Sequence, residues 1–176
     1  MQSTIRLTLA VALLSVVTAC KKEQIQPEDT GPATTPQPQP TQTETDAVNP
    51  RDWTDPRNLD NPDSLLSQRV IYFDFDKSNI RPEFRDILTA HATYMSSSNS
   101  ARVTLEGHAD ERGSREYNLG LGERRGNAVG NAISVQGARR SQSEVVSYGE
   151  ERPACRESTE TCWQRNRRVE IVYLSR

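Results

Sequence analysis

Hydrophobic and polar residues alternate with a period of two in three segments of the chain. These segments are "RVIYFDFD" at 69–76, "ARVTLEGH" at 101–108 and "RRVEIVYL" at 167–174. Alternation that involves β-branched and aromatic residues is typical of strands with one buried face. A further segment, "SEVVSYG" at 143–149, is expected to form a short strand or an edge segment.

Helical periodicity separates these predicted strands. After Pro82, which suits a first helical turn, apolar residues recur at helical spacing at Phe84, Ile87, Leu88, His91 and Met95. A second helix is expected from about Ser114 to Val135, and a short one within "STETCWQRNRR", with Ser158 or Thr159 as its N-cap. Alternating strands and helices predict an α/β (α+β) two-layer sandwich, with helices packed on a mixed β-sheet.

The N-terminus has the features of a secretory signal. Arg6 precedes the apolar run "LTLAVALLSVV", which is too short to span a bilayer, and small residues then lead to Cys20. This ending resembles the lipobox of bacterial lipoproteins, which implies removal of residues 1–19 and lipidation of Cys20. Lys21 and Lys22 follow it, and the resemblance then implies sorting to the outer membrane. The alternative is an ordinary signal with a chance cysteine.

Residues 20–64 are expected to form a tether. This segment holds most of the prolines and few apolar residues, so it buries too little surface to offset the entropy of ordering. The globular domain is therefore predicted at 65–176, which is long enough for one small core.

Cysteine usage agrees with an exported protein. Lipidation of Cys20 leaves Cys155 and Cys162 as a pair, which should form a disulfide in an oxidising periplasm. A metal site is the alternative, but "CRESTETC" offers no further ligands of the usual kinds. We expect this small loop to lie away from the candidate pocket described next.

Charged side chains concentrate between residues 106 and 125, where a strand should give way to a helix. Arg125 interrupts the apolar stripe of that helix, so its head group should sit at the rim of the core and need acceptors. Asn118 lies on the same face, and Asp110 precedes the helix. These three residues are candidates for one pocket. The alternative is a solvated, salt-bridged surface.

Other chemistries fit the sequence less well. "GLGERRG" is a poor dinucleotide fingerprint, and "DFDKSN" has Asn79 where a calcium loop requires glycine. His108 and Asp110 have no third metal ligand beside them, and residues 106–125 have no basic excess, which argues against nucleic acid. A hydrolase that pairs Glu106 with Asp110 stays an alternative.

Four ordered blocks resemble the peptidoglycan-associated lipoproteins of the OmpA C-terminal-like family. They are "VIYFDFDKSNIRPEFRDIL", "LEGHADERGSREYNLGLGERRGNAV", "VSYGEERP" and "NRRVEIVY", which together cover about residues 70–173. The resemblance implies a noncatalytic, metal-free and cofactor-free domain that binds the peptide stem of peptidoglycan through meso-diaminopimelate. The matched binding residues are Phe75, Asp76, Asp110, Arg112, Asn118, Leu121 and Arg125.

The resemblance also implies a location and partners. It implies a protein in the outer membrane, lipid-anchored and facing the periplasm, with TolB of the Tol system as the main partner and TolA as a second candidate. An OmpA-like wall anchor without a Tol role is the alternative. Two departures from the family pattern are Ala109 for the common Thr and Gly126 for the usual Ala. The several glycines of the helix expected at 114–135 have no explanation beyond close packing on the sheet.

Overall fold

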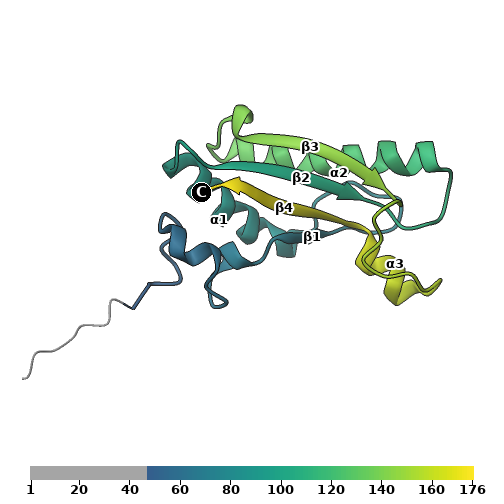
Figure 1. Cartoon of the computed structure of the whole chain (residues 1–176), viewed down its shortest axis with the longest axis horizontal. Coiled ribbons are helices and arrows are strands. Elements are labelled where there is room, and N and C mark those ends of the chain that lie inside the picture. Colours follow the sequence, from purple (N-terminus) through teal and green to yellow (C-terminus); the bar gives the residue numbers. More distant parts are fainter. Residues whose placement is uncertain (1–46) are drawn as a thin grey trace, which may run out of the picture. The chain divides into compact units, whose positions relative to one another are not determined.

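The computed structural model describes residues 47–176, which belong to one compact unit. Its sheet has the strand order β1-β4-β2-β3 (Figure 1), and the strands are β1 (Val70–Tyr72), β2 (Arg102–His108), β3 (Ser143–Gly149) and β4 (Arg168–Ser175). β2 pairs antiparallel with β4 and parallel with β3, so the sheet is mixed, as predicted.

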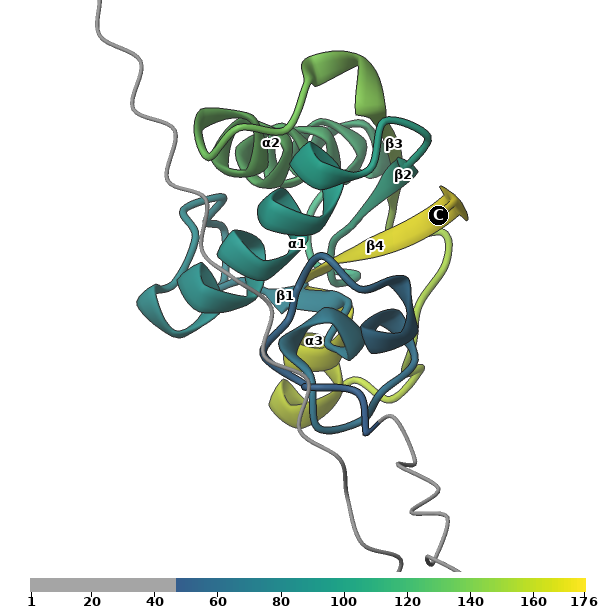
Figure 2. The same ribbon diagram turned by 90° about the vertical axis from the view of Figure 1, so that its left-hand side faces the viewer.

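Two long helices cover one face of this sheet. They are α1 (Arg85–Ser97) and α2 (Arg115–Val135), and Figure 2 shows both on the same side of the strands. A short helix, α3 (Glu160–Asn166), lies at the end of the sheet directly before β4. The core between the layers includes Leu105, Val129 and Ile171, none of which is more than 1% exposed. The predicted two-layer sandwich is therefore confirmed.

The helix starts follow the expected local chemistry. Pro82 opens a short 3-10 turn, Pro82–Phe84, which leads directly into α1. The Ser114 hydroxyl caps α2 by accepting from the Tyr117 amide at 3.2 Å. At α3 the N-cap is Thr159, whose hydroxyl accepts from the Cys162 amide at 3.3 Å, so the choice between Ser158 and Thr159 is settled.

The first predicted strand is shorter than expected. β1 ends at Tyr72, and the chain then turns through Asp76, which adopts a positive φ of 56°. A tertiary contact explains this early end of the strand. The backbone carbonyls of Asp74 and Lys77 accept hydrogen bonds from Arg125 of α2 instead of from a neighbouring strand. The alternation at 73–76 therefore continues in sequence while the strand has already stopped.

The folded domain begins before the predicted boundary at residue 65. Pro56–Leu59 forms a 3-10 helix, and Leu59 is 1% exposed within the core cluster. The buried Asn58 amide donates to the carbonyls of Asn49 and Asp52 at 2.8 and 2.7 Å. Polar turns order this segment with few apolar residues, which is why its composition resembled a tether. Cys20, the signal segment and the tether up to residue 46 lie outside the described residues.

Close packing of α2 on the sheet explains two of its glycines, Gly122 and Gly126. A Cβ on Gly126 would lie 2.5 Å from Cγ1 of Val145, and a Cβ on Gly122 would lie 2.4 Å from the Ser147 hydroxyl. On the sheet side, a Cβ on Gly107 would lie 2.0 Å from the carbonyl oxygen of Gly122. The helix backbone therefore approaches β2 and β3 more closely than any other residue would allow.

The two histidines should respond oppositely to replacement by phenylalanine. His91 bonds the Tyr173 hydroxyl (2.9 Å) and the Gln68 carbonyl (3.1 Å), so His91→Phe should destabilise the domain by about 1–3 kcal/mol. Neither ring nitrogen of the buried His108 has a hydrogen-bond partner of good geometry within residues 47–176, so His108→Phe should be neutral or stabilising at pH 7. Urea unfolding of both variants measures this difference.

The two buried histidines also predict that the stability of the domain depends on pH. Burial lowers the pKa of both histidines from 6.5 to about 4. Between these values the unfolded chain binds protons that the folded domain does not, so the free energy of unfolding should fall as pH decreases from 6.5 towards 4. His108→Phe should reduce this slope. An unchanged slope would contradict the assignment of His108 as a group that stays neutral in the fold.

Candidate functional site

A cleft of about 200 Å³ opens where the turn after β1 meets the turn between β2 and α2. Its lining residues are Phe75, Asp76, Asp110, Arg112, Gly113, Tyr117, Asn118, Leu121 and Arg125. All seven residues predicted from the sequence are thus brought together in one place. Gly113 and Tyr117 are the two that the sequence analysis did not select.

Arg125 is fully buried, whereas the sequence predicted a guanidinium at the rim of the core. Its Nε, Nη1 and Nη2 donate to the carbonyls of Lys77, His108 and Asp74 at 2.9, 2.7 and 3.1 Å. These bonds use three of the five N–H groups of the guanidinium, and the residue also contributes to the cleft lining. Burial lowers the pKa of Arg125 to about 10. Because this value is still well above 7, the guanidinium is charged at neutral pH.

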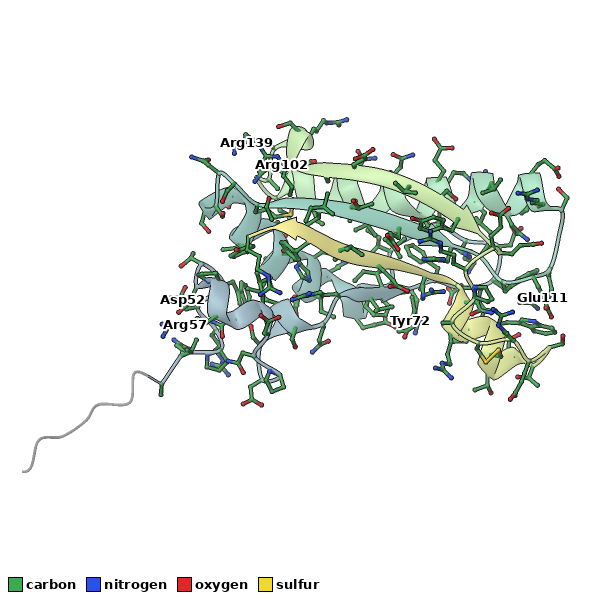
Figure 3. All side chains as sticks on the ribbon, viewed as in Figure 1. Asp52, Arg57, Tyr72, Arg102, Glu111 and Arg139 are labelled. Carbon is green, nitrogen blue, oxygen red and sulfur yellow. A yellow bond between two sulfur atoms is a disulfide. The ribbon has the colours of Figure 1, made fainter. Side chains whose placement is uncertain are left out.

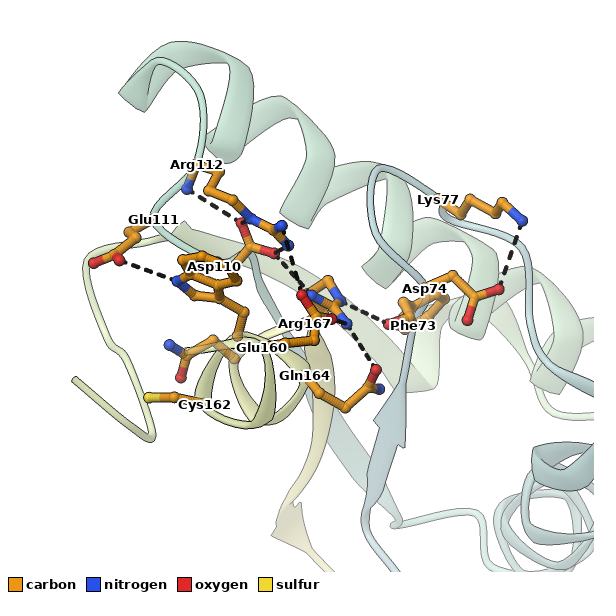
Figure 4. Close-up of polar contacts among 12 residues, drawn as sticks. Phe73, Asp74, Lys77, Asp110, Glu111, Arg112, Glu160, Cys162, Gln164 and Arg167 are labelled. Atoms are coloured by element: carbon orange, nitrogen blue, oxygen red, sulfur yellow. Dashed lines mark hydrogen bonds and ion pairs between the residues drawn. The ribbon is translucent and has the colours of Figure 1, made fainter. Parts of the chain in front are cut away.

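Asp110 is also buried, with 4% of its surface exposed, and it is surrounded by arginine donors (Figure 4). Oδ1 accepts from the backbone amide and Nε of Arg112, both at 3.1 Å. Oδ2 accepts from Nη2 of Arg112 at 2.7 Å and from Nη1 of Arg167 at 3.2 Å. Burial acts to raise the pKa of Asp110, but these hydrogen bonds outweigh it and the pKa is lowered.

Arg167 is a component of the site that the sequence analysis missed. Its side chain is 3% exposed and donates to the Phe73 carbonyl at 3.2 Å and to Glu160 and Gln164 at 2.7 Å each. Figure 4 shows it beneath Asp110, and it lies between α3 and β4 in the chain. The signal was present in the sequence, because Arg167 shares the parity of Val169 and Ile171 and so belongs to the buried side of the alternation.

Arg112 contacts two aromatic rings. Its guanidinium carbon lies 4.0 Å from the ring centroid of Phe75 and 4.1 Å from that of Trp163. The indole N–H of Trp163 in turn donates to Glu111 at 3.0 Å, so α3 is attached to the turn that carries Asp110. The Arg112 guanidinium thus packs on two rings in addition to its ion pair with Asp110.

The predicted disulfide between Cys155 and Cys162 is confirmed, with a Cα–Cα distance of 5.2 Å. As expected, no residue of the loop from Cys155 to Cys162 lines the cleft. The segment is nevertheless attached to the turn beside the cleft, because the Ser158 hydroxyl donates to Glu111 at 2.7 Å and the ring of Trp163 packs on Arg112. The length of the loop gave no information on these contacts, because they join segments that meet only in the folded chain.

The mouth of the cleft is aromatic and polar (Figure 3 shows the side chains of the whole domain). Phe75 and Tyr117 are 54% and 46% exposed, and the Tyr117 hydroxyl donates to the Asp76 carboxylate. That hydrogen bond raises the pKa of Tyr117. On the helix side, the Asn118 amide donates to Glu150 at 2.5 Å, and Leu121 supplies an apolar surface.

The structure also bears on the alternative functions that the sequence left open. Glu106 is not part of the cleft lining, so it does not face Asp110 across the cleft. Within residues 47–176, no group of three or more His, Cys, Asp or Glu side chains is placed to hold a metal ion. No helix in that part of the chain is long and apolar enough to cross a membrane.

Comparison with known proteins gives consistent matches. The sequence profile of the OmpA family matches residues 72–167. A peptidoglycan-associated lipoprotein of Pseudomonas putida is 46% identical over 108 residues, which are 61% of this chain and 64% of that protein. The peptidoglycan-associated lipoprotein of Pseudomonas aeruginosa is 45% identical over 114 residues, which are 65% of this chain and 67% of that protein. The matched region is thus less than two thirds of the P. putida protein.

Solved structures agree with this assignment. The crystal structure of the peptidoglycan-associated lipoprotein from Burkholderia pseudomallei is 40% identical with a TM-score of 0.64, and covers 65% of this chain and 98% of that one. The C-terminal domain of Helicobacter pylori MotB has a TM-score of 0.55 at 17% identity over 60% of this chain and 83% of that one, which supports the fold alone. The buried Asp110 and Arg125 thus lie in a recognised fold, and the chain belongs to the OmpA family.

Proposed function

We propose that this protein binds peptidoglycan noncovalently through the meso-diaminopimelate of the stem peptide and ties the outer membrane to the cell wall. One observation carries this proposal: a carboxylate and an arginine, Asp110 and Arg125, are both buried in the wall of one cleft. The Pseudomonas relatives, which are named as peptidoglycan-associated, support it.

The charges suit the ligand. The free end of meso-diaminopimelate carries an ammonium and a carboxylate on the same carbon, and an acid and an arginine are their complements. The two N–H groups that Arg125 does not use for backbone carbonyls are available to the carboxylate. Asp110 receives the ammonium, while Asp76, Phe75 and Asn118 border the same space.

A binding role fits this cleft better than hydrolysis. A glycosidase requires a carboxylic acid whose pKa is raised so that it holds a proton near neutral pH. Hydrogen bonds from Arg112 and Arg167 lower the pKa of Asp110 instead, so it is a carboxylate rather than a proton donor. We therefore propose that the protein is not an enzyme.

The remaining parts of the proposal rest on sequence and family. Lipidation of Cys20 would anchor the chain in the outer membrane, and the segment after it would let the domain reach the wall. TolB, and with it TolA, are proposed partners because the matched relatives are peptidoglycan-associated lipoproteins. An OmpA-like wall anchor that lacks the Tol partnership would bind the wall equally well.

A pulldown on purified sacculi tests the proposed function. The domain should sediment with sacculi that contain diaminopimelate and should release no soluble muropeptide in the same tube. Sacculi in which lysine replaces diaminopimelate keep an ammonium and lack the carboxylate, so they should retain much less protein. Asp110→Asn, which keeps the size of the side chain, should bind the diaminopimelate wall at least tenfold more weakly.

Two outcomes would count against this function. Release of muropeptides by the wild-type domain would favour a hydrolase. Equal retention on both wall types, with Asp110→Asn folded and binding normally, would mean that the cleft does not recognise diaminopimelate. The matched control is Arg115→Ala, which removes an exposed ion pair with Glu151 outside the cleft lining and should bind like the wild type.

A further inference from the structure

We propose that Arg112 is a specificity-determining residue, which covers Asp110 in the free protein and is displaced from it by the ammonium group of the ligand. This inference rests on the proposed function and adds to it. It makes Arg112 an internal competitor of the ligand rather than one more attractive contact.

The first argument is that Asp110 has no acceptor position to spare. An ionised carboxylate offers about four lone-pair positions. Asp110 uses all of them, three for the backbone amide, Nε and Nη2 of Arg112 and one for Nη1 of Arg167. An incoming ammonium must therefore replace a donor that is already bound.

The second argument identifies the donor that gives way. The Arg167 side chain is 3% exposed and is held at the same time by Phe73, Glu160 and Gln164, so its release would leave buried groups unpaired. The Arg112 side chain is 31% exposed and lies in the cleft lining. Beyond Asp110, Arg112 pairs with Glu160, at 3.6 Å. It can therefore move into water at a smaller cost.

The third argument is that Arg112 has a defined place to rest in the free protein. The rings of Phe75 and Trp163 lie 4.0 and 4.1 Å from its guanidinium carbon, and the residue that follows it is Gly113, with a φ of 112°. Glycine at this position leaves the backbone free of a Cβ next to the moving side chain. The covered state is thus stabilised by a bidentate ion pair and two ring contacts.

This arrangement selects against simple amines. A lone ammonium gains Asp110 but must first separate Arg112 from it, so its net gain is small. A ligand that also carries a carboxylate gains the two unused N–H groups of Arg125 and offsets that loss. Specificity is a difference between affinities, and a competing internal cation lowers the affinity for the wrong ligand.

Trp163 provides a direct test, because its ring touches the guanidinium that is expected to move. The chain has two tryptophans, and Trp53→Phe leaves Trp163 as the single one. In this background, a soluble muropeptide that contains diaminopimelate should change the Trp163 emission as Arg112 leaves the ring. The same titration with Arg112→Ala should give a much smaller change, although the ligand still binds.

The second readout is the change in affinity on substitution of Arg112, and the direction of this change decides between the alternatives. Arg112→Ala should bind the diaminopimelate muropeptide about three- to tenfold more tightly than its parent, and should discriminate less against the lysine muropeptide. Arg152→Ala is the matched control, because Arg152 also stacks on a ring, that of Tyr148 at 3.7 Å, but lies outside the cleft lining. It should leave both affinities unchanged.

The outcomes separate the two proposals. If the parent binds the diaminopimelate muropeptide and Arg112→Ala binds it equally or more weakly while folded, Arg112 is not a competitor and this inference is wrong. An unchanged Trp163 emission at saturation would overturn it as well. If the folded parent binds neither muropeptide, the proposed function itself fails, and this inference fails with it.

Discussion

Replacement of Arg125 by alanine should destabilise the folded domain by about 3–5 kcal/mol, before any effect on ligand binding is considered. Arg125 holds the buried carbonyls of Asp74, Lys77 and His108, and truncation would leave all three without their donor. It would also open a cavity in the floor of the cleft. Urea unfolding measures the change, and Arg124→Ala is the control because Arg124 is exposed on the same helix.

A loss of stability similar to that of Arg124→Ala would show that Arg125 does not organise the turn after β1. Because Arg125→Ala combines two effects, ligand recognition is better tested with Arg125→Lys, which keeps the charge and loses the planar fork. Measured against walls with diaminopimelate and with lysine, wild type and Arg125→Lys form a double-mutant cycle in which the ligand is one partner. A coupling energy near zero would mean that the planar fork of Arg125 does not recognise the carboxylate.

Replacement of Gly107 by alanine should have a comparably large effect, with a loss of about 3–5 kcal/mol or a failure to fold. The new Cβ would lie 2.0 Å from the carbonyl oxygen of Gly122, which is backbone and has no rotamer to change. Relief would require α2 to move away from β2, and this movement would displace Arg125 and Leu121 from the cleft. Thermal unfolding and the yield of soluble protein measure the effect.

Gly120→Ala is the control for this prediction. A Cβ at Gly120 would meet Nη1 of Arg124 at 3.3 Å, the far end of a flexible and exposed side chain. Since glycine inside a helix is less favourable than alanine by about 1 kcal/mol, this variant should be neutral or more stable. If both substitutions had the same effect, glycine content rather than close packing would be the cause.

Much of the fold follows from local pattern. The segments at 101–108 and 167–174 became β2 and β4 because alternation puts Val103, Leu105 and Ile171 on one face, whatever their partners are. α2 begins directly after Ser114, where the helix was expected to start. In contrast, the start of the domain was misplaced, because Asn58 and Leu59 are ordered by side-chain hydrogen bonds and long-range packing that leave no periodic signal.

The site shows the same division. The sequence by itself determined which residue types meet, because Asp110 follows a strand and Arg125 interrupts an apolar helical stripe in a chain whose motifs resemble a known family. Only the tertiary structure decided that Arg125 is buried under three carbonyls and that Arg167 and Arg112 share Asp110. The reason is physical: periodicity reports which face of an element is buried, whereas the partners of a buried charge come from distant segments that meet only in the folded chain.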